Sequence, residues 1–223
     1  MSVAPPRDET ELLARAQHLA GTTVGELAAL LAQAVPRDLR RHKGWLGELV
    51  ENALGATASS RPLPDFTELG VELKTIPVGD DGRPRESTHV CAVSLSELQG
   101  QRWQHSTVRL KLSRVLWVPV ESRAELPLSA RRFGLPRLWS PDTAEENVLR
   151  ADWEEHMELL TTGRFDELDA RLGQYLQIRP KAANSRAVTA AGDSGGIPGA
   201  TLPRGFYLRA SFTHTILTAG GLS

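Results

Sequence analysis

Apolar and polar positions alternate from Val71 to Lys74, at the start of a stretch, 71–78, that we interpret as a β-strand. Successive side chains of a strand point to opposite faces, so Val71 and Leu73 share one face. Glu72 and Lys74 share the other, roughly 7 Å apart at Cα for a rise of about 3.4 Å per residue. A strand with apolar neighbours that carries an acid and a base on one face indicates a functional pair, since burial of unpaired charge is costly.

The apolar pattern elsewhere predicts helices at both ends of the chain and further strands between them. Residues 115–120 are continuously apolar, as expected of a central buried strand. Apolar residues at helical spacing follow capping-box sequences that start at Asp8 and Thr23, and a third helix runs from about Gly44 to Leu54. Further strands are predicted over 87–94, 175–178 and 205–209, and further helices from Ser140, over 166–172 and over 212–219.

These elements predict an α/β fold in which a mixed sheet is flanked by helices. We expect one domain over 1–223, with an N-terminal lobe of about 1–60, a C-terminal lobe of about 65–223 and a DNA-binding cleft between them. The polar, proline-containing connector near 56–64 is the predicted hinge.

Composition narrows the class of protein. The chain has 223 residues, of which 40% are hydrophobic and 24% charged, ordinary values for a globular protein. No apolar run approaches the roughly 18 residues that cross a bilayer, and the start has no apolar signal core. The single cysteine, Cys91, excludes an internal disulfide, and together these features predict a cytoplasmic protein. The net charge of −1 argues against a protein that coats DNA, although the segment from residue 174 onward has five basic residues and one acidic.

The candidate chemistry lies in and just before the alternating strand. Asp65 precedes it across a short connection, and its carboxylate and that of Glu72 would make a hard-oxygen site of the kind that Mg²⁺ prefers. The Leu73 carbonyl is a further candidate ligand, and the Lys74 ammonium could orient a water or stabilise phosphorane charge. The pattern therefore suggests metal-assisted hydrolysis of a phosphodiester. Spacing alone favours the alternative of an edge strand with a solvated Glu–Lys pair.

A resemblance to a known family favours the hydrolytic site over the solvated pair. Pro64-Asp65 followed by Glu72-Leu73-Lys74 is similar to the PD…ExK pattern of the restriction-endonuclease-like nucleases, and the wider string 65–78 resembles the MutH family of DNA mismatch repair endonucleases. Further matching stretches run in the family's order and cover nearly the whole chain: 23–28, 43–45, 115–120, 175–184 and 202–208. The resemblance implies a restriction-endonuclease-like fold.

The resemblance also implies roles for individual residues. Asp65 and Glu72 would bind Mg²⁺ together with the Leu73 carbonyl, with Mn²⁺ or Ca²⁺ able to substitute in binding. Glu51, which the helical pattern alone makes a solvated residue on the flank of its helix, would complete the metal site. Lys111, otherwise a surface lysine, would help hold the scissile phosphate. The DNA-facing residues implied by the family are Lys43, Arg179, Lys181 and Tyr207, the last sensing adenine methylation.

The function implied by the resemblance is nicking of the unmethylated strand at hemimethylated GATC sites in double-stranded DNA. A monomer would be activated by MutL, which mismatch-bound MutS recruits. Two alternatives remain open: a GATC-specific restriction-type endonuclease, and a catalytically silent DNA-binding adaptor for MutL. Two departures from the family pattern, His89 in place of an apolar aromatic residue and a glycine-rich loop at 192–199, bear on activation and DNA grip.

Overall fold

The computed structural model describes residues 3–38, 42, 44–58, 63–94, 98–169, 171–180 and 204–219. Its chain divides into two compact units. The first comprises Met1–Glu86, Ser113–Ser140 and His214–Ser223, and the second comprises Ser87–Leu112 and Pro141–Thr213. The lobe boundary expected near residues 56–64 falls inside the first unit, so the predicted lobes and these units divide the chain differently.

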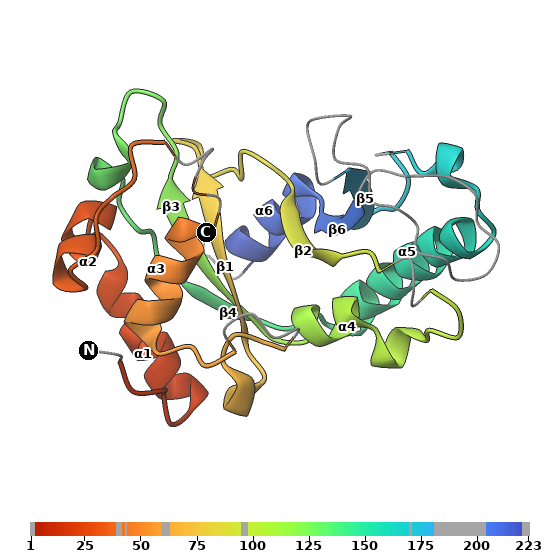
Figure 1. The fold of residues 1–223 in the computed structure, drawn as a ribbon, viewed down its shortest axis with the longest axis horizontal. Coiled ribbons are helices and arrows are strands. Elements are labelled where there is room, and N and C mark those ends of the chain that lie inside the picture. Colours follow the sequence, from red (N-terminus) through yellow and green to blue (C-terminus); the bar gives the residue numbers. More distant parts are fainter. Residues whose placement is uncertain are drawn as a thin grey trace. The chain divides into compact units, whose positions relative to one another are not determined.

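The described residues of the first unit form helices α1 to α3, the end of α6 (Ala210–Thr218) and a three-stranded sheet (Figure 1). Its elements are α1 (Glu9–Leu19), α2 (Val24–Leu30), α3 (Trp45–Leu54), β1 (Glu72–Val78), β3 (Val115–Glu121) and β4 (Arg137–Trp139). The strand order is β1-β3-β4. β3 lies in the centre, parallel to β1 and antiparallel to β4, so the sheet is mixed, and the continuous apolar run is the central strand as predicted.

Capping places the first helices where the sequence predicts them. The Asp8 carboxylate accepts the Glu11 N–H at the start of α1, and Thr23 and Glu26 form both halves of a capping box on α2. α3 begins after Gly44 and ends before Gly55, both with positive φ, which a glycine adopts without steric cost. The predicted boundaries of α3 are therefore confirmed, and α2 ends at Leu30.

One face of this sheet packs on the three helices. The Leu73, Leu116 and Val118 side chains join Leu12 of α1 and Leu49 of α3 in one buried hydrophobic cluster. The strands' opposite face is buried too, because Val115 and Trp117 are fully inaccessible to solvent. A sheet buried on both faces has little room for unpaired charge, so the buried Glu72 of β1 must have a compensating partner.

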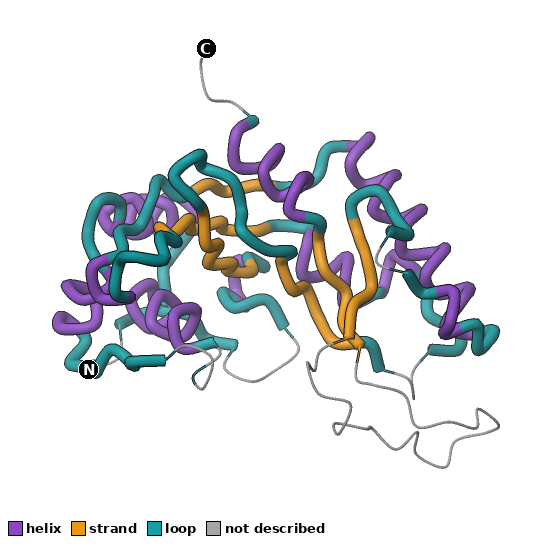
Figure 2. The backbone as a smooth tube through the Cα atoms, turned by 90° about the horizontal axis from the view of Figure 1, so that it is seen from above, coloured by secondary structure: helices purple, strands orange, loops and turns teal. Residues whose placement is uncertain are grey.

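The second unit is built on an antiparallel sheet of order β2-β6-β5. Its elements are β2 (Thr88–Ala92), α4 (Thr107–Leu112), α5 (Thr143–Thr161), β5 (Leu176–Pro180) and β6 (Arg204–Leu208), and α6 (Ala210–Thr218) begins in it and ends in the first unit. α5 packs along β5 (Figure 2). None of the helices described has the length and apolar character needed to cross a membrane.

Several expectations need correction. The α/β class is confirmed, but the strands form two small sheets rather than one mixed sheet. The strand predicted over 87–94 is observed as β2, and it pairs with β6 rather than with β1. The long helix is capped by Asp142 with Glu145, not by Ser140. The described residues of the predicted helix over 166–172 form no α-helix, and a 3-10 turn spans Phe165–Glu167.

Candidate active site

Asp65 is fixed by hydrogen bonds on both its main chain and its side chain. Its carbonyl accepts the Thr57 and Ala58 N–H groups at 2.9 and 3.1 Å. Beyond it, a 3-10 turn closes at Gly70, whose φ of +66° suits glycine, and returns the chain to β1. The Asp65 Oδ2 atom then accepts the Leu73 N–H at 2.8 Å. The acid is therefore held against the strand that carries the other candidate residues.

Glu72 and Lys74 form an ion pair on one face of β1, as the alternation predicts. The Lys74 Nζ and Glu72 Oε1 atoms are 2.6 Å apart. The Glu72 side chain is only 2% exposed and that of Lys74 16% exposed. A carboxylate this deeply buried requires a compensating charge, and the lysine supplies it. The solvated edge pair that spacing alone favours is thus not what the structure contains.

The Leu73 carbonyl faces the same edge of β1 as the Asp65 carboxylate. Glu72 donates its N–H to the Arg114 carbonyl, on the side of β3. Successive residues of a strand direct their backbone groups to opposite edges, so the N–H and C=O of Leu73 face away from β3. The Asp65 side chain receives the Leu73 N–H at that edge. One carboxylate and one carbonyl oxygen are therefore presented together.

Glu51 shares the electrostatic environment of these acids. It lies on α3, and a Cβ added at Gly47, one turn earlier, would have the Glu51 carboxylate and the Thr75 hydroxyl of β1 within 4 Å. Burial, together with the negative charges of Asp65, Glu48 and Glu72, raises the pKa of Glu51 to about 7, against a smaller opposing effect of Lys74. The helix thus places a carboxyl group where a proton or a cation is favoured at neutral pH.

The donor set fits a hard divalent cation. The candidate ligands are all oxygens, from Asp65, Glu72, Glu51 and the Leu73 carbonyl, which suits Mg²⁺, Mn²⁺ or Ca²⁺ rather than zinc. The raised pKa of Glu51 reports an excess of negative charge that such an ion would relieve. Within the described ranges, no three acid, histidine or cysteine side chains already stand in the arrangement of a closed metal site. The acids are therefore gathered in one region without converging on one point.

The remaining predicted residues belong to the second unit or are not among the described residues. Lys111 is on α4, in the second unit, so its role at the scissile phosphate stays a prediction. Arg179 is exposed on β5, where its Nη1 atom lies 3.4 Å from the Ser87 hydroxyl. Tyr207 on β6 is half-buried, with its ring edge-on to His89 at 5.1 Å between centroids. Lys43 and Lys181 lie outside the described residues, as does the glycine-rich loop at 192–199.

Comparisons with known proteins identify the family. A family model described as "DNA mismatch repair enzyme MutH" matches residues 54–152. The DNA mismatch repair protein MutH of Vibrio parahaemolyticus is 54% identical over 212 residues, which cover 95% of this chain and 94% of that protein. The chain belongs to the MutH family. Proteins of the same name from Serratia proteamaculans and Shewanella baltica are 54% and 52% identical, over 96% of this chain and 93% and 96% of theirs.

The range matched by the MutH family model includes most, but not all, of the candidate catalytic residues. The matched range 54–152 contains Asp65, Glu72, Lys74 and Lys111, while Glu51 precedes it. The curated MutH proteins extend the similarity over nearly the whole chain, which includes Glu51 and Tyr207. The resemblance drawn from sequence motifs is therefore confirmed at the level of the family.

One acid that affects Glu51 is not singled out by the sequence pattern. Glu48 lies three residues before Glu51 on α3 and contributes to the raised pKa of that residue. Residues three apart on a helix are neighbours on its surface, so the pair could have been noticed from spacing. Glu48 is exposed, which explains why the apolar pattern gave no reason to single it out.

Proposed function

We propose that this chain is a metal-dependent DNA endonuclease of mismatch repair. The observation that carries the proposal is the arrangement on β1: Asp65 and the Leu73 carbonyl at one edge, with the buried Glu72 paired to Lys74 on the adjoining face. Membership of a family whose model is described as a mismatch repair enzyme supports the same activity. The fold is proposed to be restriction-endonuclease-like, on the strength of the PD…ExK sequence.

Each residue has a part in the proposed hydrolysis. A divalent ion, Mg²⁺ in the cell, would supply Lewis acidity at the phosphodiester when bound. Asp65, Glu72 and the Leu73 carbonyl would hold it, with Glu51 as an additional acid. Lys74 would orient the attacking water and stabilise charge on the phosphate oxygens. A P–O bond forms to the water oxygen, the bond to the leaving sugar oxygen breaks, and that oxygen takes up a proton.

The substrate and partners are proposed from the same family resemblance. The DNA is a hemimethylated GATC site, nicked on its unmethylated strand by a monomer. Activation is by MutL, recruited by MutS. Arg179 and Tyr207 would contact DNA from β5 and β6, and Lys43, Lys111 and Lys181 would contact phosphates, because lysine and arginine supply most such contacts. A single cysteine is consistent with a cytoplasmic location.

The test is nicking of a supercoiled plasmid with one GATC site, unmethylated, hemimethylated or fully methylated, with Mg²⁺ and with or without MutL. Nicks confined to the unmethylated strand and stimulated by MutL are expected. Double-strand cleavage without MutL would instead indicate a restriction-type enzyme. Binding that needs no Mg²⁺, with no cutting under any condition, would indicate an adaptor and overturn the proposal.

A further inference from the structure

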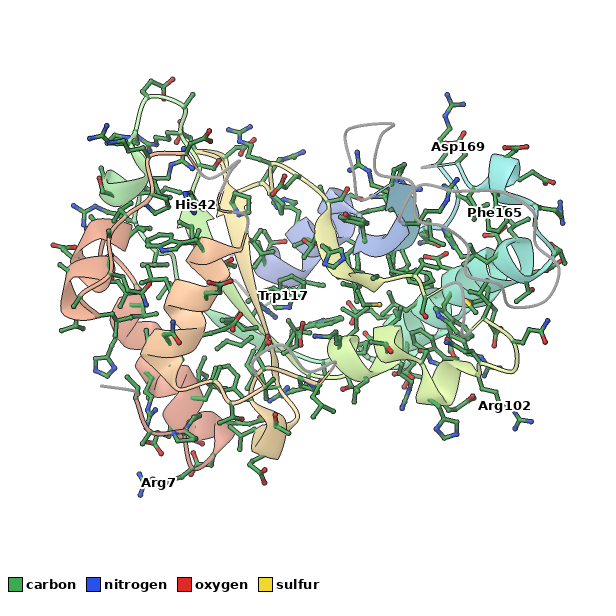
Figure 3. The ribbon with its side chains drawn as sticks, in the orientation of Figure 1. Arg7, His42, Arg102, Trp117, Phe165 and Asp169 are labelled. Atoms are coloured by element: carbon green, nitrogen blue, oxygen red, sulfur yellow. The ribbon has the colours of Figure 1, made fainter. Side chains whose placement is uncertain are left out.

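The neighbour of Lys74 on the central strand is a tryptophan. In the parallel pairing of β1 with β3, Lys74 is in register with Trp117. Side chains in register on adjacent strands lie on the same face of the sheet, roughly 5 Å apart at the backbone. Figure 3 shows the labelled Trp117 among side chains in the interior, and no part of it is accessible to solvent. The lysine stem therefore has a rigid aromatic neighbour.

A second basic residue is in register with Trp117 on the neighbouring strand. Arg137 of β4 pairs with Trp117, so Trp117 stands between Lys74 and Arg137 in one row of residues across the sheet. Trp139 packs edge-on to Trp117, with 6.2 Å between ring centroids and 63° between ring planes. The face of an indole ring carries negative potential, so cations beside it are attracted.

The indole N–H indicates that Trp117 is not explained by packing alone. The Nε1 atom is buried and has no hydrogen-bond partner among the described residues. A buried donor without an acceptor is destabilising, and a leucine at this position would avoid the cost. The opposite face of the same strand is filled by the aliphatic Leu116 and Val118. The ring must therefore provide something that an aliphatic side chain would not.

Lys74 is the group that gains from such a neighbour. Its stem has four rotatable bonds, and its ammonium must stay against Glu72, two residues away on the strand, at 2.6 Å. We propose that Trp117 is a positioning residue for Lys74: the indole supports the lysine stem and holds the ammonium against the Glu72 carboxylate. The expected effect of Trp117 on the nicking rate rests on the proposed hydrolysis. The packing of Trp117 against Lys74 does not depend on that function.

The first experiment compares Trp117→Leu and Trp117→Phe in Mg²⁺-dependent nicking. Trp117→Leu removes the aromatic face and should lower kcat about 3- to 30-fold, the range of a partly buried cation–π contact, with KM for DNA unchanged. Trp117→Phe keeps an aromatic face and should stay within about 3-fold of wild type. Equal rates for Trp117→Leu and wild type, or equal losses in both variants, would overturn the inference.

A matched control separates positioning from general loss of stability. Trp153 is also buried, 3% exposed, but belongs to α5 in the second unit. Trp153→Leu should lower the unfolding midpoint in urea and leave kcat of the folded protein unchanged. If Trp153→Leu slows nicking as much as Trp117→Leu does, the loss is not specific to Lys74 and the inference fails.

A stability cycle tests the contact without relying on activity. Trp117→Leu, Lys74→Met and the double variant are unfolded in urea. The double variant should be less destabilised than the sum of the single ones, by about 3- to 10-fold in the unfolding constant, because the second change removes a contact already lost. Additive effects would overturn the inference. A wild-type protein that does not nick would count against the proposed function alone, and the cycle would still decide whether Trp117 holds Lys74.

Discussion

Each of the two compact units buries a carboxylate, and the two are satisfied in different ways. In the first unit, Glu72 is 2% exposed and is compensated by the side chain of Lys74. In the second, Asp152 of α5 is 6% exposed, and its oxygens accept the N–H groups of residues 174, 175 and 176 at 2.8, 2.6 and 2.8 Å. Backbone donors are fixed, whereas an ammonium on a flexible stem can move.

This difference separates a structural acid from a chemical one. The Asp152 carboxylate anchors the chain entering β5 through backbone N–H donors. Glu72 is held by Lys74, to which the proposed hydrolysis assigns a role, and it contributes to the raised pKa, about 7, of Glu51. Burial of an acid therefore does not by itself indicate a catalytic site. The kind of group that compensates the buried charge, backbone N–H or a lysine, is the more informative observation.

The largest expected effect is on catalysis in the first unit. Asp65→Ala or Lys74→Ala should reduce nicking by at least about 10²- to 10⁴-fold, because each removes a group needed at the reacting phosphate. Circular dichroism and the urea midpoint should show a folded protein in both cases. Glu68→Ala, an exposed acid on the turn after Asp65, is the control and should nick normally. Retained activity in either site variant would remove that residue from the mechanism.

The next effect is on stability in the second unit. Asp152→Ala leaves three backbone donors without their acceptor and should lower the free energy of unfolding by about 3–5 kcal/mol. Glu154→Ala, which breaks an exposed pair with Arg150 on the same helix, should change it by less than about 1 kcal/mol. Urea titration measures both. If Asp152→Ala lowers the free energy of unfolding only slightly, water replaces the carboxylate as the acceptor. Asp152 would then not be the structural acid that the comparison with Glu72 assumes.

The smallest effect depends on pH. The folded-state pKa of Glu51, about 7, lies above its usual value of 4.5, so the folded protein binds a proton that the unfolded chain releases between these values. Stability therefore falls as pH rises through that window. Without divalent ions, Glu51→Gln should stabilise the protein by about 1–3 kcal/mol at pH 8, after allowance for partial exposure, and give no gain at pH 4.5.

Divalent ions sharpen the same measurement. Mg²⁺ should reduce the gain from Glu51→Gln, because the ion relieves the repulsion that the substitution removes. Unfolding curves at pH 8 with Mg²⁺ and with a chelator give the comparison. A gain of equal size at pH 8 and pH 4.5, or one that Mg²⁺ leaves unchanged, would show that Glu51 does not share a site with the other acids.

Local patterns predicted local features well. The caps at Asp8 and Thr23 and the glycine limits of α3 all depend on residues within four positions of one another. The start of α5 was misplaced because Ser140-Pro141 resembles a helix start, although Asp142 and Glu145 form the capping box. The error came from preferring one valid local signal over another two residues away.

Pairing between distant segments could not be predicted in this way. β2 joins β6, with Thr88 opposite Leu208, and nothing within either segment specifies a partner so far along the chain. The position of Glu51 has the same origin. The helical pattern placed it on a flank of α3, but only the packing of α3 against β1 brings it near Asp65. The candidate residues were therefore identified from motifs, while their electrostatic coupling came from the fold.

The division of the chain into two units has a consequence for how this protein can be altered. The backbone passes from one unit to the other at residues 86–87, 112–113, 140–141 and 213–214. Neither unit is a continuous stretch of sequence, so no single gene segment encodes either one. Recombination at the 86–87 crossing would replace Asp65 and β1 together, but β3 and β4, which complete the same sheet, would still come from the original protein. A protease that cuts once, at any of these four crossings, leaves the other three connections between the units in place.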